Sequence, residues 1–378
     1  MPNQISSGDT AWMLMSAALV FVMVPGLSFF YTGLVRKKNA LNTLMMTLVA
    51  MAIGTVVWLV VGYSLAFASG TPWLGGFQWC GFNGVGQATV DYAPTIPHFA
   101  FAAFQGMFAA ITPALISGAI VERMNFRAYV TFLTLWSAVI YAPVAHWVWG
   151  ADGWIHKLGA LDFAGGTVVH VSAGCAALVC ALMLGPRTDH KRAALVPHNV
   201  PFVLLGAGLL WFGWFGFNGG SALAANGTAG LAFVTTNLSA CGAMLTWLVL
   251  ESFRSGKPTA VGAATGSVVG LVGITPAAGY VTPIAGLAIG MITAAVSFAA
   301  LQLRSRSELD DTLDVFACHG IGGISGAILT GCFATLAMNS SGADGLFAGN
   351  PSLLLAQLTA ISATILYASI GSAALLKV

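Results

Sequence analysis

Apolar stretches of about 20 residues recur along the whole chain, and each is long enough to cross a hydrocarbon core of about 30 Å as a helix. Only 7% of the residues are Asp, Glu, Lys or Arg and 57% are hydrophobic, which excludes an ordinary soluble domain. The sequence therefore predicts an all-α integral membrane protein whose single membrane domain spans residues 1–378. We count eleven stretches, at 10–33, 41–66, 98–121, 125–149, 162–185, 200–220, 230–253, 260–276, 282–303, 313–336 and 351–377.

Lysine and arginine fall in alternate loops between the predicted helices. The odd-numbered loops and the chain end carry Arg36, Lys37, Lys38, Arg123, Arg127, Arg187, Lys191, Arg192, Arg254, Lys257, Arg304, Arg306 and Lys377. The even-numbered loops hold only Lys157. Because basic loops stay on the cytoplasmic side, we expect a multi-pass protein of the plasma (inner) membrane with an external N-terminus and a cytoplasmic C-terminus. No basic segment precedes the first stretch, so we expect no cleaved signal peptide.

Several function classes find no support in the sequence. Six cysteines occur, without a CxxC pattern or a Cys/His spacing that would suggest a metal site. We therefore expect no cofactor and no metal. The net charge of +2 gives no reason to expect nucleic acid as a partner. A nucleotide-binding loop and a Ser/His/Asp arrangement are also lacking, so we do not expect an enzyme.

Three short patterns occur twice, each time five predicted helices apart. Because five is an odd number, the two halves would cross the membrane in opposite directions, as in the inverted repeats of many secondary transporters. We expect pseudo-repeats at about 10–185 and 200–336, with an eleventh helix at 351–377 outside them. The paired patterns are Ile-Thr-Pro-Ala at 111–114 and 274–277, Phe-x-x-Gly at 30–33 and 217–220, and an aspartate eight residues ahead of a histidine at 162–170 and 311–319.

The two Asp-to-His segments predict a pair of histidines near the middle of the membrane. Eight residues of helix span roughly 12 Å, so His170 would lie that far from the external face, where Asp162 starts its segment. His319 would lie equally far from the cytoplasmic face, where Asp311 starts its segment. In a core of about 30 Å the two imidazoles would then be close enough for contact. The alternative is two unrelated core histidines that bond to backbone carbonyls.

Several of these segments resemble the ammonium transporter/Rhesus (Amt/Rh) family across nearly the whole chain. The presence of Trp149 together with both histidines is closer to the Amt branch. The resemblance implies a narrow hydrophobic pore in each subunit of a homotrimer, and transport of ammonium or ammonia, with methylammonium as a possible further substrate. The matching motifs are Ala103-Phe-Gln-Gly-Met-Phe108, Ala145-His-Trp-Val-Trp-Gly150, Asp162-Phe-Ala-Gly-Gly166, Pro197-His-Asn199, Gly213-Trp-Phe-Gly-Phe-Asn218 and Asp314-Val-Phe-Ala-Cys-His319.

The resemblance also implies roles for individual residues. Trp149, Phe108 and Ser221 would recruit ammonium at the external mouth, through cation–π attraction and a hydroxyl acceptor. Phe108 and Phe217 would form a stacked gate that excludes bulk water. His170 and His319 would line the pore below the gate, where neutral imidazoles can accept and relay a proton. Transport by this route would be electrogenic.

Asp162 has two possible roles. It could be a direct cation ligand in the pathway, or it could cap the helix that follows and support cation affinity from a distance. We favour the cap, because a direct carboxylate ligand would slow the release of the cation. Asp311 or Asp314 would have the mirrored role at the cytoplasmic end.

The sequence ends at Val378, just after the last predicted helix, whereas members of the family usually continue into a cytosolic tail. That tail couples subunits and helps to bind regulators of the PII type. We therefore keep a second interpretation, in which this membrane module belongs to a longer signalling protein, with a fused C-terminal signalling domain, and senses ammonium with slow or no transport.

Overall fold

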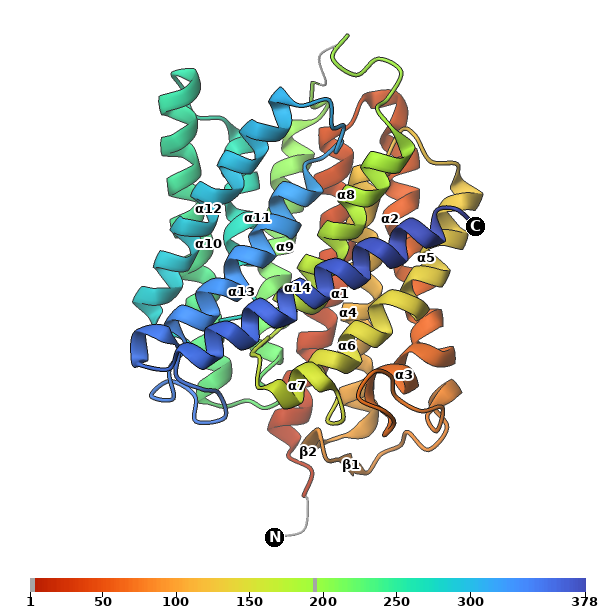
Figure 1. Ribbon diagram of the computed structural model, residues 1–378, viewed down its shortest axis with the longest axis vertical. Helices are drawn as coiled ribbons and strands as arrows, with labels where there is room; N and C mark the ends of the chain where they lie inside the picture. Colours follow the sequence, from red (N-terminus) through yellow and green to blue (C-terminus); the bar gives the residue numbers. More distant parts are fainter. Residues whose placement is uncertain (1–3, 193–195) are drawn as a thin grey trace.

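The computed structural model describes residues 4–192 and 196–378, and these residues form a bundle of helices. The longer helices run between two opposite faces of the bundle (Figure 1). Their bounds are α1 (Ser7–Leu34), α2 (Ala40–Val57), α3 (Tyr63–Phe67), α4 (His98–Ile120), α5 (Phe126–Trp136), α6 (Ala142–Trp149), α7 (Trp154–Leu158), α8 (Ser172–Leu184), α9 (Val200–Gly220), α10 (Gly227–Ser255), α11 (Ala260–Ile274), α12 (Pro283–Arg306), α13 (Ile321–Phe333) and α14 (Pro351–Leu375).

Ten helical spans in the described residues are long and apolar enough to cross a membrane, and the shorter apolar helix α11 corresponds to the eighth predicted stretch. All eleven predicted stretches therefore contain a helix, which confirms the predicted all-helical membrane fold. The clearest difference is at the fifth stretch. Its helix begins at Gly166 and not at 162, because residues 159–165 form a loop that is described below.

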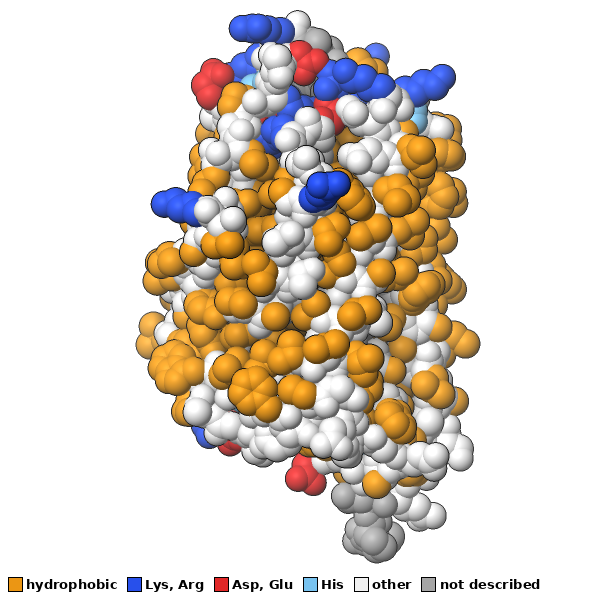
Figure 2. Space-filling model, turned by 90° about the vertical axis from the view of Figure 1, so that its right-hand side faces the viewer, with side chains coloured by type: hydrophobic (Ala, Val, Ile, Leu, Met, Phe, Trp, Pro, Cys, Tyr) orange, Lys and Arg blue, Asp and Glu red, His pale blue; other side chains and the backbone are white. Residues whose placement is uncertain are grey.

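Many large apolar side chains are exposed on the outside of the helices, as expected for a multi-pass membrane protein. Figure 2 shows hydrophobic side chains over most of one face, with lysine and arginine gathered at the end opposite the N-terminus. Phe253, Ile284 and Leu303, which lie on α10 and α12, are among the large apolar side chains that are exposed. Exposed side chains of this kind are stable in contact with lipid or with another apolar protein surface.

The end of the bundle where α1 begins, which the predicted orientation makes external, carries a cap that the sequence did not predict. Residues 68–97 connect α3 to α4 and contain a short antiparallel pair of strands, β1 (Thr89–Val90) and β2 (Ala93–Pro97). Below the cap the Tyr63 hydroxyl forms a hydrogen bond with His98, and Trp79 stacks on Tyr63 with 5.4 Å between ring centroids. The cap therefore closes the external end over α3 and α4.

Helices that the predicted repeat would pair are in direct contact at the centre of the bundle. A Cβ atom at Gly206 of α9 would overlap the backbone at Phe30 of α1. Likewise, a Cβ atom at Gly174 of α8 would overlap the backbone of Gly320, which precedes α13. Only glycine allows such a close backbone approach. These contacts are the ones that a pseudo-twofold axis would require, and the repeat itself remains a prediction.

The two central histidines lie in π-helical segments, which the sequence also did not predict. His170 belongs to the segment Gly166–Val171, directly before α8, and His319 belongs to the segment Phe316–Gly320, directly before α13. A π-turn takes in one residue more than an α-turn and often occurs at functional sites. Each histidine therefore lies in a π-helical turn, directly before the corresponding helix in its half of the chain.

Candidate transport pathway

Three cavities follow one another through the bundle. We name the two larger cavities after the orientation predicted from the basic loops. The external cavity, of about 520 Å³, reaches from the cap to Phe108, and the cytoplasmic cavity, of about 540 Å³, reaches up to Phe30. Between them lies a small apolar cavity of about 10 Å³, whose lining includes Phe217, His170 and His319. The polar vestibules are thus separated by a narrow, mostly apolar segment.

The external cavity contains all three residues that the resemblance assigned to ammonium recruitment. The rings of Trp149 and Phe108 meet edge to face, with 5.8 Å between centroids. The indole N–H of Trp149 donates to the backbone carbonyl of Asp162 at 2.9 Å, which fixes the ring. The Ser221 hydroxyl also lines the cavity and donates to the carbonyl of Phe217 at 2.9 Å, so its oxygen lone pairs are left to accept from a ligand.

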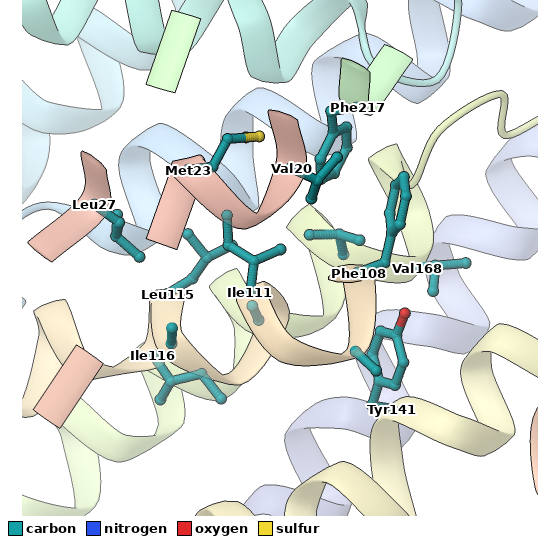
Figure 3. Close-up of a cluster of buried hydrophobic side chains, with 14 of the residues drawn as sticks. Val20, Met23, Leu27, Phe108, Ile111, Leu115, Ile116, Tyr141, Val168 and Phe217 are labelled. Carbon is teal, nitrogen blue, oxygen red and sulfur yellow. The ribbon is translucent and has the colours of Figure 1, made fainter. Parts of the chain in front are cut away.

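Phe108 and Phe217 separate the external cavity from the central one. Their ring centroids are 4.3 Å apart at 38°, and both side chains are buried. Figure 3 shows the two rings together at one side of the apolar side chains that continue along the pathway, among them Met23 and Ile111. Water cannot form a continuous file through rings packed at this distance.

Phe30 is a functional candidate that the sequence analysis did not single out. It lines both the central and the cytoplasmic cavity, and so it closes the pathway at the end opposite Phe217. Phe30 and Phe217 occupy the same position in the repeated Phe-x-x-Gly pattern. That match was the signal that could have identified it.

The two predicted histidines are in contact. Nδ1 of His170 lies 3.2 Å from Nδ1 of His319, and the rings are nearly parallel with 5.2 Å between centroids. Both side chains are buried, and Nε2 of His170 has no hydrogen-bond partner among the described residues. Since two neutral imidazoles can share only one proton between their Nδ1 atoms, one ring donates and the other accepts. The free Nε2 is available to a molecule in the central cavity.

Trp214 is a second residue that the sequence analysis missed. Its indole stacks on His170, with 5.5 Å between centroids at 20°. The indole N–H donates to the Thr275 hydroxyl at 2.9 Å, which holds the ring against the histidine. Thr275 belongs to the second Ile-Thr-Pro-Ala pattern, so this pattern fixes one wall of the central cavity. Trp214 lies within the matching motif at 213–218, but that motif did not indicate a role for it in the pathway.

The Asp162 carboxylate is fully engaged by backbone amides. One oxygen accepts from Gly165 and Gly166 at 2.8 and 2.6 Å, and the other accepts from Thr167 and Val168 at 2.8 and 3.0 Å. The carboxylate therefore satisfies the amides that the first turn of the helix leaves without partners. Its position also places the negative charge at the positive end of the helix. This geometry supports the cap and leaves few lone pairs for a direct cation ligand.

The cytoplasmic end does not repeat this arrangement. Asp311 accepts one close amide, that of Phe316 at 2.7 Å, and its other oxygen has no partner among the described residues. Asp314, whose φ of 56° lies in the left-handed region, forms an ion pair with Arg304 at 2.7 Å. Of the two candidates for the mirrored role, only Asp311 thus accepts an amide of the following segment, and this end has fewer capping bonds than Asp162 provides.

A cluster of charged side chains holds the cytoplasmic loops together. Arg187 donates two side-chain hydrogen bonds to Asp310, both at 2.8 Å, and Arg36 forms an ion pair with Glu122. Burial raises the pKa of the Glu122 carboxyl, but hydrogen bonding to Arg36 and the charges of Arg36 and Arg187 lower it more. The net pKa of Glu122 is therefore below its ordinary value of 4.5. Asp310 also has a lowered pKa, because its bonds to Arg187 outweigh the effect of burial.

The fold and this pathway define a multi-pass membrane protein with one narrow conduit, in which vestibules at both ends lead to a buried histidine pair. Residues 11–378 match the model of the Ammonium Transporter Family. The chain is 50% identical to an ammonium transporter of Bacillus subtilis over 372 residues, which cover 98% of this chain and 91% of the relative. The chain therefore belongs to the ammonium transporter family, and its function is the transport of ammonium and not enzyme catalysis.

Solved structures agree with this assignment. Mep2 of Saccharomyces cerevisiae superposes with a TM-score of 0.93 at 40% identity, over 98% of this chain and 88% of that one. A structure described as a sensor Amt protein superposes with a TM-score of 0.90 at 30% identity, over 98% of this chain and 92% of that one. The shared fold thus includes a protein described as a sensor.

Proposed function

We propose that ammonium binds in the external vestibule, loses a proton there, and crosses the central cavity as ammonia, while the proton passes along the histidine pair. In the cytoplasmic vestibule ammonia and a proton recombine to form ammonium. One positive charge then crosses the membrane for each molecule transported. Trp149, Phe108 and Ser221 recruit the cation, Phe108 and Phe217 form the gate, and His170 and His319 carry the proton.

The size and lining of the central cavity support this order of events. A bare monovalent cation loses tens of kcal/mol of hydration in an apolar medium, by idealised estimates. The central cavity of about 10 Å³ has no room for a hydration shell, and its lining is apolar apart from the two histidines and the indole of Trp214. Ammonia is neutral and loses far less on entry, so deprotonation at the mouth is the less costly route.

The 3.2 Å contact between His170 and His319 is the observation that carries the proposal. A proton that reaches one imidazole can leave from the other. The ring that accepts a proton on one nitrogen can release the proton on its other nitrogen to the neighbouring ring. Replacing His170 with alanine removes one half of this relay. Ammonia could still diffuse through the enlarged cavity, but the accompanying charge would have no path.

The experiment is an ammonium-concentration jump on proteoliposomes, with native protein and His170→Ala, and ammonium binding measured on the same samples. We expect a saturating inward current in the native protein, and in the variant no current but continued alkalinisation of the lumen as ammonia enters. An unaltered current in the variant would refute the histidine relay. Repeating the measurement with methylammonium tests the second substrate.

A sensor function is the second candidate, and the likeness to the sensor Amt structure favours it. A sensor requires an ammonium site that is coupled to the last helix, but it does not require fast turnover. In the same proteoliposomes, saturable ammonium binding without sustained current would identify this function. A native current that persists at saturating ammonium would exclude a sensor without transport.

We further infer a homotrimer with one pore per subunit, an external N-terminus and a cytoplasmic C-terminus. The alternation of basic loops supports this orientation, and the exposed apolar residues of α10 and α12 can provide a subunit interface. A PII-type regulator would bind at the cytoplasmic face, where lysine and arginine gather. Native mass spectrometry in detergent tests the trimer, and accessibility labelling of single cysteines placed in the loops tests the orientation.

A further inference from the structure

Gln357 is a buried glutamine near the external end of α14 whose amide group bonds to two other parts of the bundle. Its Oε1 accepts from the backbone N–H of Leu161 at 2.7 Å. Its Nε2 donates to the carbonyl of Leu161 at 2.8 Å and to that of Ala327 on α13 at 3.0 Å. Both amide hydrogens and one oxygen lone pair are therefore used, and the side chain is only 1% exposed.

The segment that Gln357 binds forms one wall of the external vestibule. Residues 160–164 form a loop between α7 and the helix that begins at Gly166, and Leu161 and Asp162 both line the external cavity. Asp162 follows Leu161 directly. Its carbonyl accepts from the Trp149 indole, and its carboxylate caps the helix that carries His170. An unpaired buried backbone group is costly, so the two bonds to Leu161 determine where this segment lies.

We propose that Gln357 is a positioning residue of the external ammonium site, and that through it α14 holds Leu161, Asp162 and Trp149 in their recruiting geometry. This inference rests on the recruiting role of Trp149 proposed above. Gln357 is not among the lining residues of the three cavities, so it acts on the ammonium site through the backbone of Leu161. Its substitution would move the Trp149 ring relative to Ser221 and weaken the attraction for the cation.

Because Gln357 lies on α14, its hydrogen bonds connect the last helix of the chain to the external mouth of the pathway. Figure 1 shows α14 crossing the face of the bundle obliquely. It lies outside both predicted pseudo-repeats, so the repeat provides no equivalent contact at the cytoplasmic mouth. There the segment before α13 is held instead by the loop residue Arg123, which donates to Thr312 at 3.3 Å. The external mouth is thus the end of the pathway that is bonded to the last helix.

The test compares Gln357→Met with Thr364→Val on the same helix. Methionine matches the length of glutamine and removes all three hydrogen bonds, whereas Thr364 is a buried residue whose hydroxyl has no partner among the described residues. Currents give the ammonium concentration for half-saturation and the maximum current. Hydrogen exchange followed by mass spectrometry gives the protection of residues 161–168. Trp149→Leu is measured in parallel.

For Gln357→Met we expect half-saturation to rise about fivefold, the order expected for a weakened cation–π contact, with the maximum current close to native. Exchange should accelerate within residues 161–168, and Thr364→Val should match the native protein in both measurements. Unchanged exchange would overturn the inference. So would faster exchange with native half-saturation, if Trp149→Leu raises half-saturation. If neither substitution changes half-saturation, the recruiting role of Trp149 fails, and with it the positioning role of Gln357.

Discussion

The four amides bound by Asp162 give a quantitative test of its role. A helix cap with one bond contributes about 0.5–2 kcal/mol. Hydrogen bonds to charged groups contribute about 1.5–3 kcal/mol each, so four of them give a simple sum of about 6–12 kcal/mol. The adjacent external cavity is large enough to admit water, which could bind the four amides in place of the carboxylate and offset part of the lost free energy. We therefore expect Asp162→Ala to destabilise the protein by about 3–6 kcal/mol, clearly more than loss of an ordinary cap.

Asp162→Asn distinguishes a cap from a cation ligand. The amide oxygen of asparagine can still accept from one pair of amides, Gly165 and Gly166 or Thr167 and Val168, but its NH₂ group cannot serve the other pair. The loss should therefore be smaller, about 2–4 kcal/mol. Transport should fall in step with stability, because the recruiting geometry depends on the cap.

The assay is unfolding in mixed micelles by titration with dodecyl sulfate, combined with current measurements on proteoliposomes. Asp152→Asn is the matched control, because Asp152 is a half-buried carboxylate that pairs with Lys157 at 3.6 Å and accepts only one amide, that of Gly70 at 3.2 Å, which an asparagine oxygen can still accept. Surface pairs of this kind contribute about 0–1 kcal/mol. An Asp162→Asn protein with native stability and no ammonium binding would refute the cap and identify Asp162 as a direct ligand.

Three further predictions concern the gate, the helix crossing and the cytoplasmic charges. Phe217→Ala should admit water and produce a proton current without ammonium, detected with a pH-sensitive dye inside the liposomes; a tight membrane would argue against the gate. Gly174→Ala should lower the melting temperature and abolish current, because its Cβ would overlap the backbone of Gly320, directly before α13. Gly208→Ala, where nothing lies within 4 Å, should remain near native in both measurements. The lowered pKa of Glu122 means that its ion pairs contribute fully above pH 4.5 and are lost as the pH falls through the lowered value. The contribution of these ion pairs to the melting temperature should therefore be lost below about pH 4.5. Glu122→Gln should show a smaller fall in melting temperature on acidification than the native protein, and an equal fall in the two proteins would contradict this.

The number of helices could be predicted because a bilayer restricts which structures can cross it. Backbone groups must be paired within each span, and each span must be long enough to cross. The contact between His170 and His319 was predicted from the rise of an α-helix, and it is present although residues 162–165 form a loop and both histidines lie in π-helical segments. These predictions needed only distances along the chain. Packing against neighbouring helices did not enter into them.

The rest depended on local geometry that residue patterns do not record. The π-helical segments around the two histidines have no compositional signal, because one extra residue in a turn leaves an apolar run apolar. The different roles of Asp311 and Asp314 depend on the positive φ of Asp314, and nothing in the sequence indicates that conformation. Gln357 did have a signal: a lone glutamine in an apolar span is costly unless it is paired, so it should have been treated as a candidate.

The volume of the central cavity limits how molecules can pass through it. A space of about 10 Å³ is close to the smallest that accommodates one water molecule. Ammonia is similar in size to water, so the central segment holds one substrate molecule at a time. Two molecules cannot push one another through, as ions do in a multi-ion channel. Unidirectional fluxes of isotopically labelled substrate should therefore be independent of one another, with a flux-ratio exponent of about one, as in a carrier and not as in a long single-file pore.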